Sequence, residues 1–153
     1  MNSRDEAERR IRLAERHLYE AEEATNRNDF PEAVGHSQLC VENAAKAIIA
    51  CFCIPSWSHD PSEELRQAVV PLKLEQAAMA EIERLADFAH LLAPEHGRTN
   101  YGTITHLPDE LYGKTEAKDA LGMARQALRI ARGFIRDYYD RPNNEGTYSG
   151  RSS

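Results

Sequence analysis

The residues best suited to chemistry lie in a glycine-containing segment in the second half of the chain. Arg98, Tyr101 and His106 occur close together there. A guanidinium can hold a phosphate with two hydrogen bonds, and a phenol ring can stack on a nucleobase or donate from its hydroxyl. Gly97 and Gly102 would let backbone amides approach the same anion. The segment predicts a ligand site for an anionic nucleotide or RNA, with a structural role for Arg98, bonding loop carbonyls, as the alternative.

Two further histidines, His59 and His96, are candidates to join this site. His59 follows a stretch rich in helix-breaking residues, and His96 lies two residues before Arg98. Each would add an imidazole to the guanidinium and the phenol. The alternative for each is that it caps a helix or is an ordinary surface group.

A stripe of arginines on the last predicted helix is a second candidate. Its members recur at spacings of four, three and four residues: Arg125, Arg129, Arg132 and Arg136. RNA phosphates could lie along such a stripe. The alternative is ion pairing with acids that recur every seven residues near the N-terminus, namely Glu8, Glu15 and Glu22. Repeated charge attracts anions without positioning them, so we expect residues 94–114, and not the stripe, to form the ligand site.

The composition narrows the class of protein. The 153 residues suffice for one domain with a hydrophobic core, and 41% hydrophobic with 29% charged residues is typical of a soluble helical protein. A formal net charge of −6 excludes a general basic field, so RNA binding would need a local patch. The longest apolar run, residues 47–54, is too short to cross a bilayer, and no signal-peptide pattern precedes it. We expect a cytoplasmic protein with no membrane partner.

The cysteines argue against a metal centre. Cys40, Cys51 and Cys53 lie on one predicted helix, and the last two, being two residues apart, point to nearly opposite sides. They cannot hold one ion together, and the chain has no second cysteine pair. We therefore expect buried, reduced thiols, no metal site and no cofactor.

The helix predicted over residues 31–53 is the element around which the rest of the chain is arranged. Asp29 is its predicted N-cap, and a proline follows in the first turn. Apolar residues recur along it at helical spacing and fill most of its circumference, which is typical of a central helix covered by neighbours. Glu42 and Lys46, four residues apart, are expected to pair on its one exposed strip.

Amphipathic patterns predict the other helices of the domain, over residues 5–27, 61–70, 74–92 and 115–138. Residues 94–114 contain three glycines and two prolines and are predicted to form a long loop. The predicted fold class is therefore all-α, an up-down bundle of four to five helices over residues 1–140. The composition of residues 141–153 is typical of a disordered tail.

A glutamine, a glutamate and a lysine stand at four-residue spacing on the central helix, as Gln38, Glu42 and Lys46. A predicted helix hairpin over residues 16–34 precedes them, and His59 follows after a short loop. Over about residues 10–138 these features resemble the HEPN domain family, named for its occurrence in higher eukaryotes and prokaryotes. The resemblance implies a helical bundle that commonly forms homodimers. Family members include ribonuclease toxins, partners of minimal nucleotidyltransferases, and modules that bind nucleotides or RNA.

Nuclease members of this family carry an arginine, four to six residues and then a histidine near the start of the last long helix. Three such spacings occur in this chain, away from that position: Arg10–His17, Arg12–His17 and Arg84–His90. Arg98 and His106 lie nearer to it, but seven residues separate them, and Arg98 to Gly102 looks more like the Arg-Tyr element of members without the nuclease motif. The resemblance thus implies a non-catalytic module that binds a nucleotide, RNA or a protein such as a nucleotidyltransferase. A metal-independent ribonuclease, the toxin of a toxin–antitoxin pair, is the alternative, and a purely structural dimer is a third.

Overall fold

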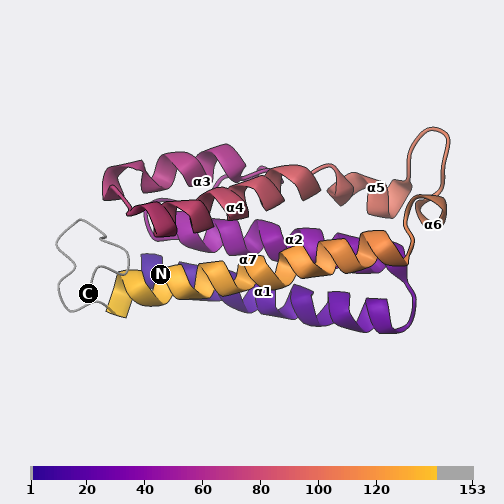
Figure 1. Ribbon diagram of the computed structural model, residues 1–153, viewed down its shortest axis with the longest axis horizontal. Helices are drawn as coiled ribbons and strands as arrows, with labels where there is room; N and C mark the ends of the chain where they lie inside the picture. The colour runs from indigo at the N-terminus through magenta and orange to yellow at the C-terminus, as the bar shows by residue number, and fades with distance from the viewer. Residues whose placement is uncertain (1, 141–153) are drawn as a thin grey trace.

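The computed structural model describes residues 2–140 as a bundle of α-helices without strands. The long helices run up and down along one axis (Figure 1): α1 (Ser3–Asn26), α2 (Phe30–Ala50), α4 (Gln76–Leu92) and α7 (Lys114–Asp140). Short helical segments fill the connections between them: α3 (Ser62–Val69), a 3-10 turn (Val70–Leu72), α5 (Glu95–Tyr101) and α6 (Pro108–Leu111). This confirms the predicted all-α up-down bundle. The tail predicted over residues 141–153 lies outside the described residues.

Cap residues set the start of both helices of the N-terminal hairpin. Asn2 accepts a hydrogen bond from the backbone N–H of Asp5 at 2.8 Å, and Asp29 accepts one from the backbone N–H of Glu32 at 3.4 Å. Between the two helices Asn28 has a positive φ of 62°, which asparagine tolerates better than most residues. The chain therefore reverses in a short turn, and the predicted hairpin is confirmed.

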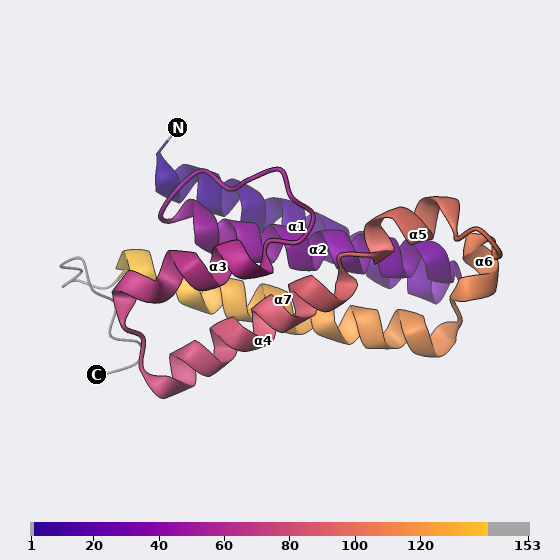
Figure 2. The same ribbon diagram turned by 90° about the horizontal axis from the view of Figure 1, so that it is seen from above.

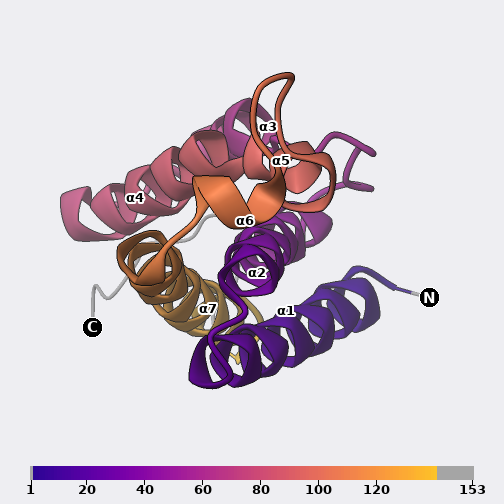
Figure 3. The same ribbon diagram turned by 90° about the vertical axis from the view of Figure 1, so that its right-hand side faces the viewer.

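Helix α2 lies at the centre of the bundle, with α1, α7, α4 and α5 around it (Figure 3). Ala44, Ala45 and Ile48 on this helix are fully buried. The prediction of a central helix is confirmed. Glu42 and Lys46 are buried as well, so the expectation that they pair on an exposed strip is wrong. The chain that follows α2 covers this strip, a tertiary effect that local spacing does not reveal.

Alanine seams let the long helices approach one another closely. Ala7, Ala14 and Ala21 of α1 are fully buried. Helix α7 shows the same seven-residue repeat, with buried side chains at alternating small and large positions: Ala117, Leu121, Ala124, Leu128, Ala131 and Ile135. The amphipathic helices predicted over residues 5–27 and 115–138 are confirmed. Because the seams carry few bulky groups, α1 packs against α2 and α7 together.

Helices α5 and α6 occupy much of residues 94–114, so the prediction of one long loop is wrong. Pro94 and Pro108 stand at the starts of these helices, where the missing N–H of proline costs nothing. Helix α5 ends at Gly102, whose φ is 74°. A Cβ at this position would lie 2.2 Å from the carbonyl oxygen of His106, so only glycine fits.

The cysteines agree only in part with the prediction that all three are buried. Cys40 and Cys51 are buried as expected, but Cys53 is exposed because α2 has already ended and the chain turns outward. Among residues 2–140, no helix combines the length and the apolar character needed to cross a membrane.

Replacing Ile48 with aspartate should unfold the protein, because an unpaired charge would enter the centre of the bundle. Ile104→Asp is the matched control, since Ile104 is fully exposed. Circular dichroism during heating measures both variants. A cooperatively melting Ile48→Asp protein would contradict the central position of α2.

Candidate functional site

A row of polar side chains runs along one side of α2 and is buried. Gln38 Nε2 donates to Glu42 Oε1 at 2.8 Å, and Lys46 Nζ donates to Glu42 Oε2 at 3.0 Å. Burial alone would raise the pKa of Glu42, but the hydrogen bonds from Gln38 and Lys46 outweigh it, so the pKa of Glu42 is lowered. The carboxylate is therefore ionised, and both of its oxygens are held in place.

Two histidines from distant parts of the sequence lie over this row. His59 Nδ1 is 3.1 Å from Glu42 Oε1, and His96 Nδ1 is 3.2 Å from Gln38 Oε1. The two imidazole rings stack with their centroids 3.5 Å apart and their planes 20° from parallel. The chain after α2 turns back over that helix toward α5 (Figure 2). His59 lies on this returning segment and His96 on α5, and their rings meet.

The hydrogen bonds fix which nitrogen of each ring carries the proton. The ionised carboxylate of Glu42 only accepts, so Nδ1 of His59 donates to it. Gln38 Oε1 also only accepts, so Nδ1 of His96 donates as well. In the neutral form of each ring Nε2 is then the nitrogen able to take a proton. His59 is half exposed, so solvent or a ligand can reach its ring.

Helix α5 is held in place by contacts at its start and in its middle. At its start Glu95 accepts a hydrogen bond from the hydroxyl of Tyr112, and burial together with this carboxylate raises the pKa of Tyr112. Thr99, in the middle of α5, packs against Gly35 of α2, where an added Cβ would lie 3.0 Å from Thr99 Oγ1. The glycine thus allows the close approach of α5 to α2, and that approach places His96 over Gln38.

The predicted ligand residues divide into two groups. His59 and His96 converge, as described, and Arg98 and Tyr101 lie on the same helix as His96. Arg98 is partly exposed, with Nη1 3.8 Å from a carboxylate oxygen of Glu95, and Tyr101 is exposed. His106 lies between α5 and α6, where its hydrogen bonds go to neighbouring threonines, and it does not join the stacked pair.

Sequence reasoning missed three members of this region. Gln38 was named only through the family resemblance, and Glu42 otherwise only as a partner of Lys46; the contacts of both with the histidines depend on the fold. Trp57 was overlooked, although an almost fully exposed tryptophan two residues before His59 is an available stacking surface. Its position in a short loop, where no core packing is needed, was the signal that could have revealed it.

The site also contains residues suited to a metal ion. One ligand atom each from Glu42, His59 and His96 lies within 4.8 Å of the other two. Imidazole nitrogen and carboxylate oxygen are ligands that zinc takes in proteins. The expectation of no metal site considered only the cysteines, and no sequence spacing connects these three residues.

The histidines that match the family's nuclease spacing form other contacts. His17 Nδ1 lies 3.0 Å from His36 Nδ1 on α2. Burial lowers the pKa of His17, and the adjacent His36 lowers it further. His90 Nδ1 lies 2.8 Å from a carboxylate oxygen of Asp60. These contacts join histidine to histidine and histidine to carboxylate, not histidine to arginine.

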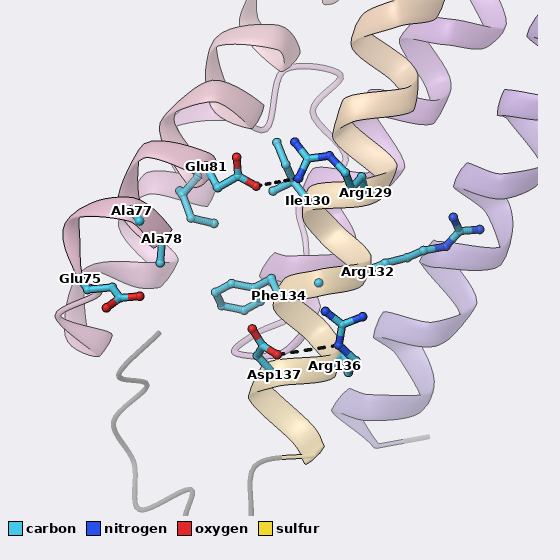
Figure 4. A pocket seen from close by; sticks show the side chains of 12 residues that line it. Glu75, Ala77, Ala78, Glu81, Arg129, Ile130, Arg132, Phe134, Arg136 and Asp137 are labelled. Atoms are coloured by element: carbon cyan, nitrogen blue, oxygen red, sulfur yellow. Dashed lines mark hydrogen bonds and ion pairs between the residues drawn. The ribbon is translucent and has the colours of Figure 1, made fainter. Parts of the chain in front are cut away.

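Three arginines of the stripe, Arg129, Arg132 and Arg136, line a groove between α4 and α7 (Figure 4). The groove has a volume of about 430 Å³ and a floor of apolar side chains that includes Ala78, Ile82, Ile130 and Phe134. Arg129 bonds Glu81 across it at 3.1 Å. Arg136 lies 3.8 Å from Asp137.

The other arginines of the stripe pair with α1. Arg125 Nη2 lies 3.1 Å from Glu22 Oε2, and Arg132 donates to Glu15. The predicted alternative of ion pairing is therefore confirmed for these two acids, whereas Glu8 pairs within its own helix. Exposed pairs of this kind contribute less than about 1 kcal/mol each, but together they fix α7 against its neighbours.

Comparison with known proteins agrees with this architecture. The family model of the HEPN domain matches residues 7–134. A protein of Methanocaldococcus jannaschii named "Putative toxin MJ1304" is 29% identical over 136 residues, which are 84% of this chain and 88% of that protein. The crystal structure of TT1696 from Thermus thermophilus has a TM-score of 0.69 at 19% identity and covers 86% of this chain and 98% of its own. The crystal structure of ST0689, an archaeal HEPN homologue, has a TM-score of 0.62 at 24% identity and covers 84% of this chain and 97% of its own.

Replacing Lys46 with methionine should destabilise the protein by about 3–5 kcal/mol, because the buried carboxylate of Glu42 would lose its cation. Adding Glu42→Gln to Lys46→Met should recover most of this loss, since an amide needs no counter-ion. Urea unfolding at neutral pH measures both free energies of unfolding. An equal loss in the single and double variants would contradict the role of this pair.

The double variant also tests how the pair responds to pH. The unfolded chain protonates Glu42 near the ordinary value of 4.5, whereas the folded protein keeps it ionised at lower pH because its pKa is lowered. The stabilisation from Glu42 is therefore present above about pH 4.5 and is lost as pH falls through the lower folded pKa. We expect acidification to reduce the free energy of unfolding less in the double variant than in the wild type.

Proposed function

The chain belongs to the HEPN domain family, and from this membership we propose that it binds RNA or a nucleotide, without cleaving it, on the face where α5 crosses α2. The proposal includes a homodimer and a place in a toxin–antitoxin pair, with a nucleotidyltransferase as its protein partner. The proposed binding residues are His59, His96, Arg98 and Tyr101, together with Trp57, which precedes His59 by two residues.

The buried row on α2 is the observation that carries this proposal. A buried ion pair is weak evidence for stability, because removing two charges from water costs about as much as their attraction returns. Glu42 and Lys46 are therefore not explained by stability alone. Glu42 and Gln38 orient two imidazoles at the surface, and positioned polar groups of this kind are typical of a binding site.

Groups on the same helix as His96 and on the same loop as His59 suit an anionic, aromatic ligand. Arg98 offers a guanidinium for a phosphate, and its carboxylate neighbour is at the limit of ion-pair distance, so a ligand phosphate can compete for it. Tyr101 and Trp57 are exposed rings on which bases can stack. The stripe arginines are less suited, because Arg125, Arg129 and Arg132 already bond carboxylates.

The toxin–antitoxin part of the proposal is supported by the similarity to the protein named as a toxin, which extends over most of both chains. The homodimer is supported by the family resemblance. The alanine seams of α1 and α7 are buried inside the bundle and are not available to a second copy. Exposed apolar side chains near the end of α5, Ile104 and Leu107, remain as surface for a partner.

A ribonuclease is the second candidate, and one observation favours it. A buried carboxylate that holds Nδ1–H of a histidine leaves Nε2 as a base, which is the usual arrangement for general-base catalysis. His59 has this arrangement. The nearest match to the family's arginine–histidine pattern is Arg98 with His106. These two residues do not form a pair, because His106 bonds the threonines of its own turn.

Arg98→Ala should weaken binding of a short single-stranded RNA by roughly 1.5–3 kcal/mol, the scale of a hydrogen bond to a charged group, while the fold stays intact. Arg129→Ala is the matched control and should change affinity little, mainly at low salt. Fluorescence anisotropy with labelled RNA and with competing nucleotides measures both. Loss of binding in Arg129→Ala, with normal binding in Arg98→Ala, would show that the site lies on α7.

The purified protein should not cleave RNA in the presence of a chelator, because the arginine–histidine pair of the nuclease members is not formed. Gel analysis of a labelled RNA after incubation tests this. Cleavage that disappears in His59→Ala, His90→Ala or His106→Ala would establish the ribonuclease alternative and identify its histidine.

A further inference from the structure

We propose that Glu42, His59 and His96 form a binding site for one divalent transition-metal ion of the zinc class. The site draws its three ligands from α2, from the loop that follows it and from α5. The inference stands on the arrangement of these side chains and does not depend on RNA or nucleotide binding.

The distances suit a small ion with short bonds. Zinc bonds nitrogen and oxygen at about 2.0–2.2 Å, so two ligands on one tetrahedral ion lie roughly 3.3–3.5 Å apart. Glu42 Oε1 and His59 Nδ1 are already 3.1 Å apart. The ligand atom of His96 lies within 4.8 Å of both, so it has to approach by at most about 1.3 Å.

The ion would replace the proton that now joins His59 to Glu42. The proton of the neutral ring then moves to Nε2, which faces away from the ion. The ring of His96, which is now stacked nearly parallel to that of His59, must turn so that the lone pair of its ligating nitrogen points at the ion. Both movements are confined to side chains, and His59 is half exposed, so the backbone of α2 and α5 can stay in place.

Gln38 and Lys46 are placed as outer partners of the ligands. Lys46 holds Glu42 Oε2 at 3.0 Å, which leaves Oε1 as the ligand atom. Gln38 contacts both Glu42 and His96 through its amide, as outer-shell groups commonly do for metal ligands. The positive charge of Lys46 lowers the affinity for any cation, so we expect a moderate binding constant and not a tightly held structural ion.

The ligand types select the class of ion. Calcium and magnesium take oxygen ligands, whereas two imidazoles and one carboxylate suit zinc, cobalt or nickel. Three protein ligands would leave a fourth position for water or an anion, and His59 is half exposed. Glu42 and Lys46 cancel in charge, so a bound ion would leave the site positive and favour an anion at that position.

Cobalt titration of the full-length, chelator-washed protein tests the site, because tetrahedral Co²⁺ has visible absorption bands that report its ligands. We expect one equivalent of Co²⁺ per chain, displaced by Zn²⁺, with the bands absent in His59→Ala and in His96→Ala. Gln38→Ala should weaken binding about 10- to 100-fold, the usual effect of removing an outer-shell partner. Zn²⁺ should also raise the melting temperature of the wild type but not of the two histidine variants.

Matched controls separate this site from other histidines. His90→Ala and His106→Ala remove exposed imidazoles and should bind as the wild type does. His36→Ala removes one member of the other close histidine pair and should also leave binding unchanged. Absence of stoichiometric binding to the wild type would overturn the inference, whether or not any variant folds. So would binding that persists in His59→Ala or is lost only in His36→Ala.

The proposed metal site and the proposed RNA binding can be disproved independently of each other. Metal binding is measured without RNA or nucleotide, and RNA binding is measured in chelator. A protein that binds RNA but no metal would retain the proposed function and lose this inference, and the reverse result would do the opposite.

Discussion

The buried ion pair between Glu42 and Lys46 is the constraint on which the rest of the structure depends. Two opposite charges buried inside a bundle are tolerated only if they are paired and hydrogen-bonded. Lys46 takes one carboxylate oxygen, and Gln38 and His59 share the other. One of these partners comes from outside α2, so the loop after α2 has to return over the helix. The path of this loop and the site are thus linked by one requirement, since His59, which completes the carboxylate shell, is also half exposed to solvent.

The position of α5 also follows from the need of buried polar groups for hydrogen-bond partners. Gln38 gives its N–H group to Glu42, and its carbonyl oxygen then needs a donor of its own, which His96 supplies. For His96 to reach Gln38, α5 has to lie close to α2, and Gly35 beneath Thr99 permits this. Gly102 then lets the chain leave α5 in a direction that other residues could not adopt. Helix α5 is short and carries few buried side chains, so its position depends on these specific contacts more than on apolar packing.

The sequence predicts those features that depend on local spacing. Seven-residue repeats locate α1 and α7, the cap at Asp29 locates the start of α2, and four-residue spacing pairs Glu42 with Lys46. It does not predict that this pair is buried, because burial depends on a loop whose path has no periodic pattern. Helix α5 was missed because a seven-residue helix containing Gly97 has too few turns to show an apolar repeat. The contact between His59 and His96 lies beyond any sequence pattern, since each ring is placed by a different element.

The two uses proposed for the histidine pair make opposite demands on one proton. In RNA binding the proton stays on Nδ1 of His59, which donates it in a hydrogen bond to Glu42; this keeps the carboxylate shell complete and leaves Nε2 for the ligand. In metal binding that proton leaves Nδ1, and the ion takes over its role of joining the ring to the carboxylate. The charge of the site differs accordingly, because Glu42 and Lys46 cancel without an ion and leave a positive centre with one. With a net charge of −6 on the whole chain, a local positive centre has a large effect on whether an anion approaches. Without an ion, this face offers a ligand only a hydrogen-bond acceptor and no net charge. A single bound ion would therefore turn it into a site that attracts anions, with no movement of the helices beneath it.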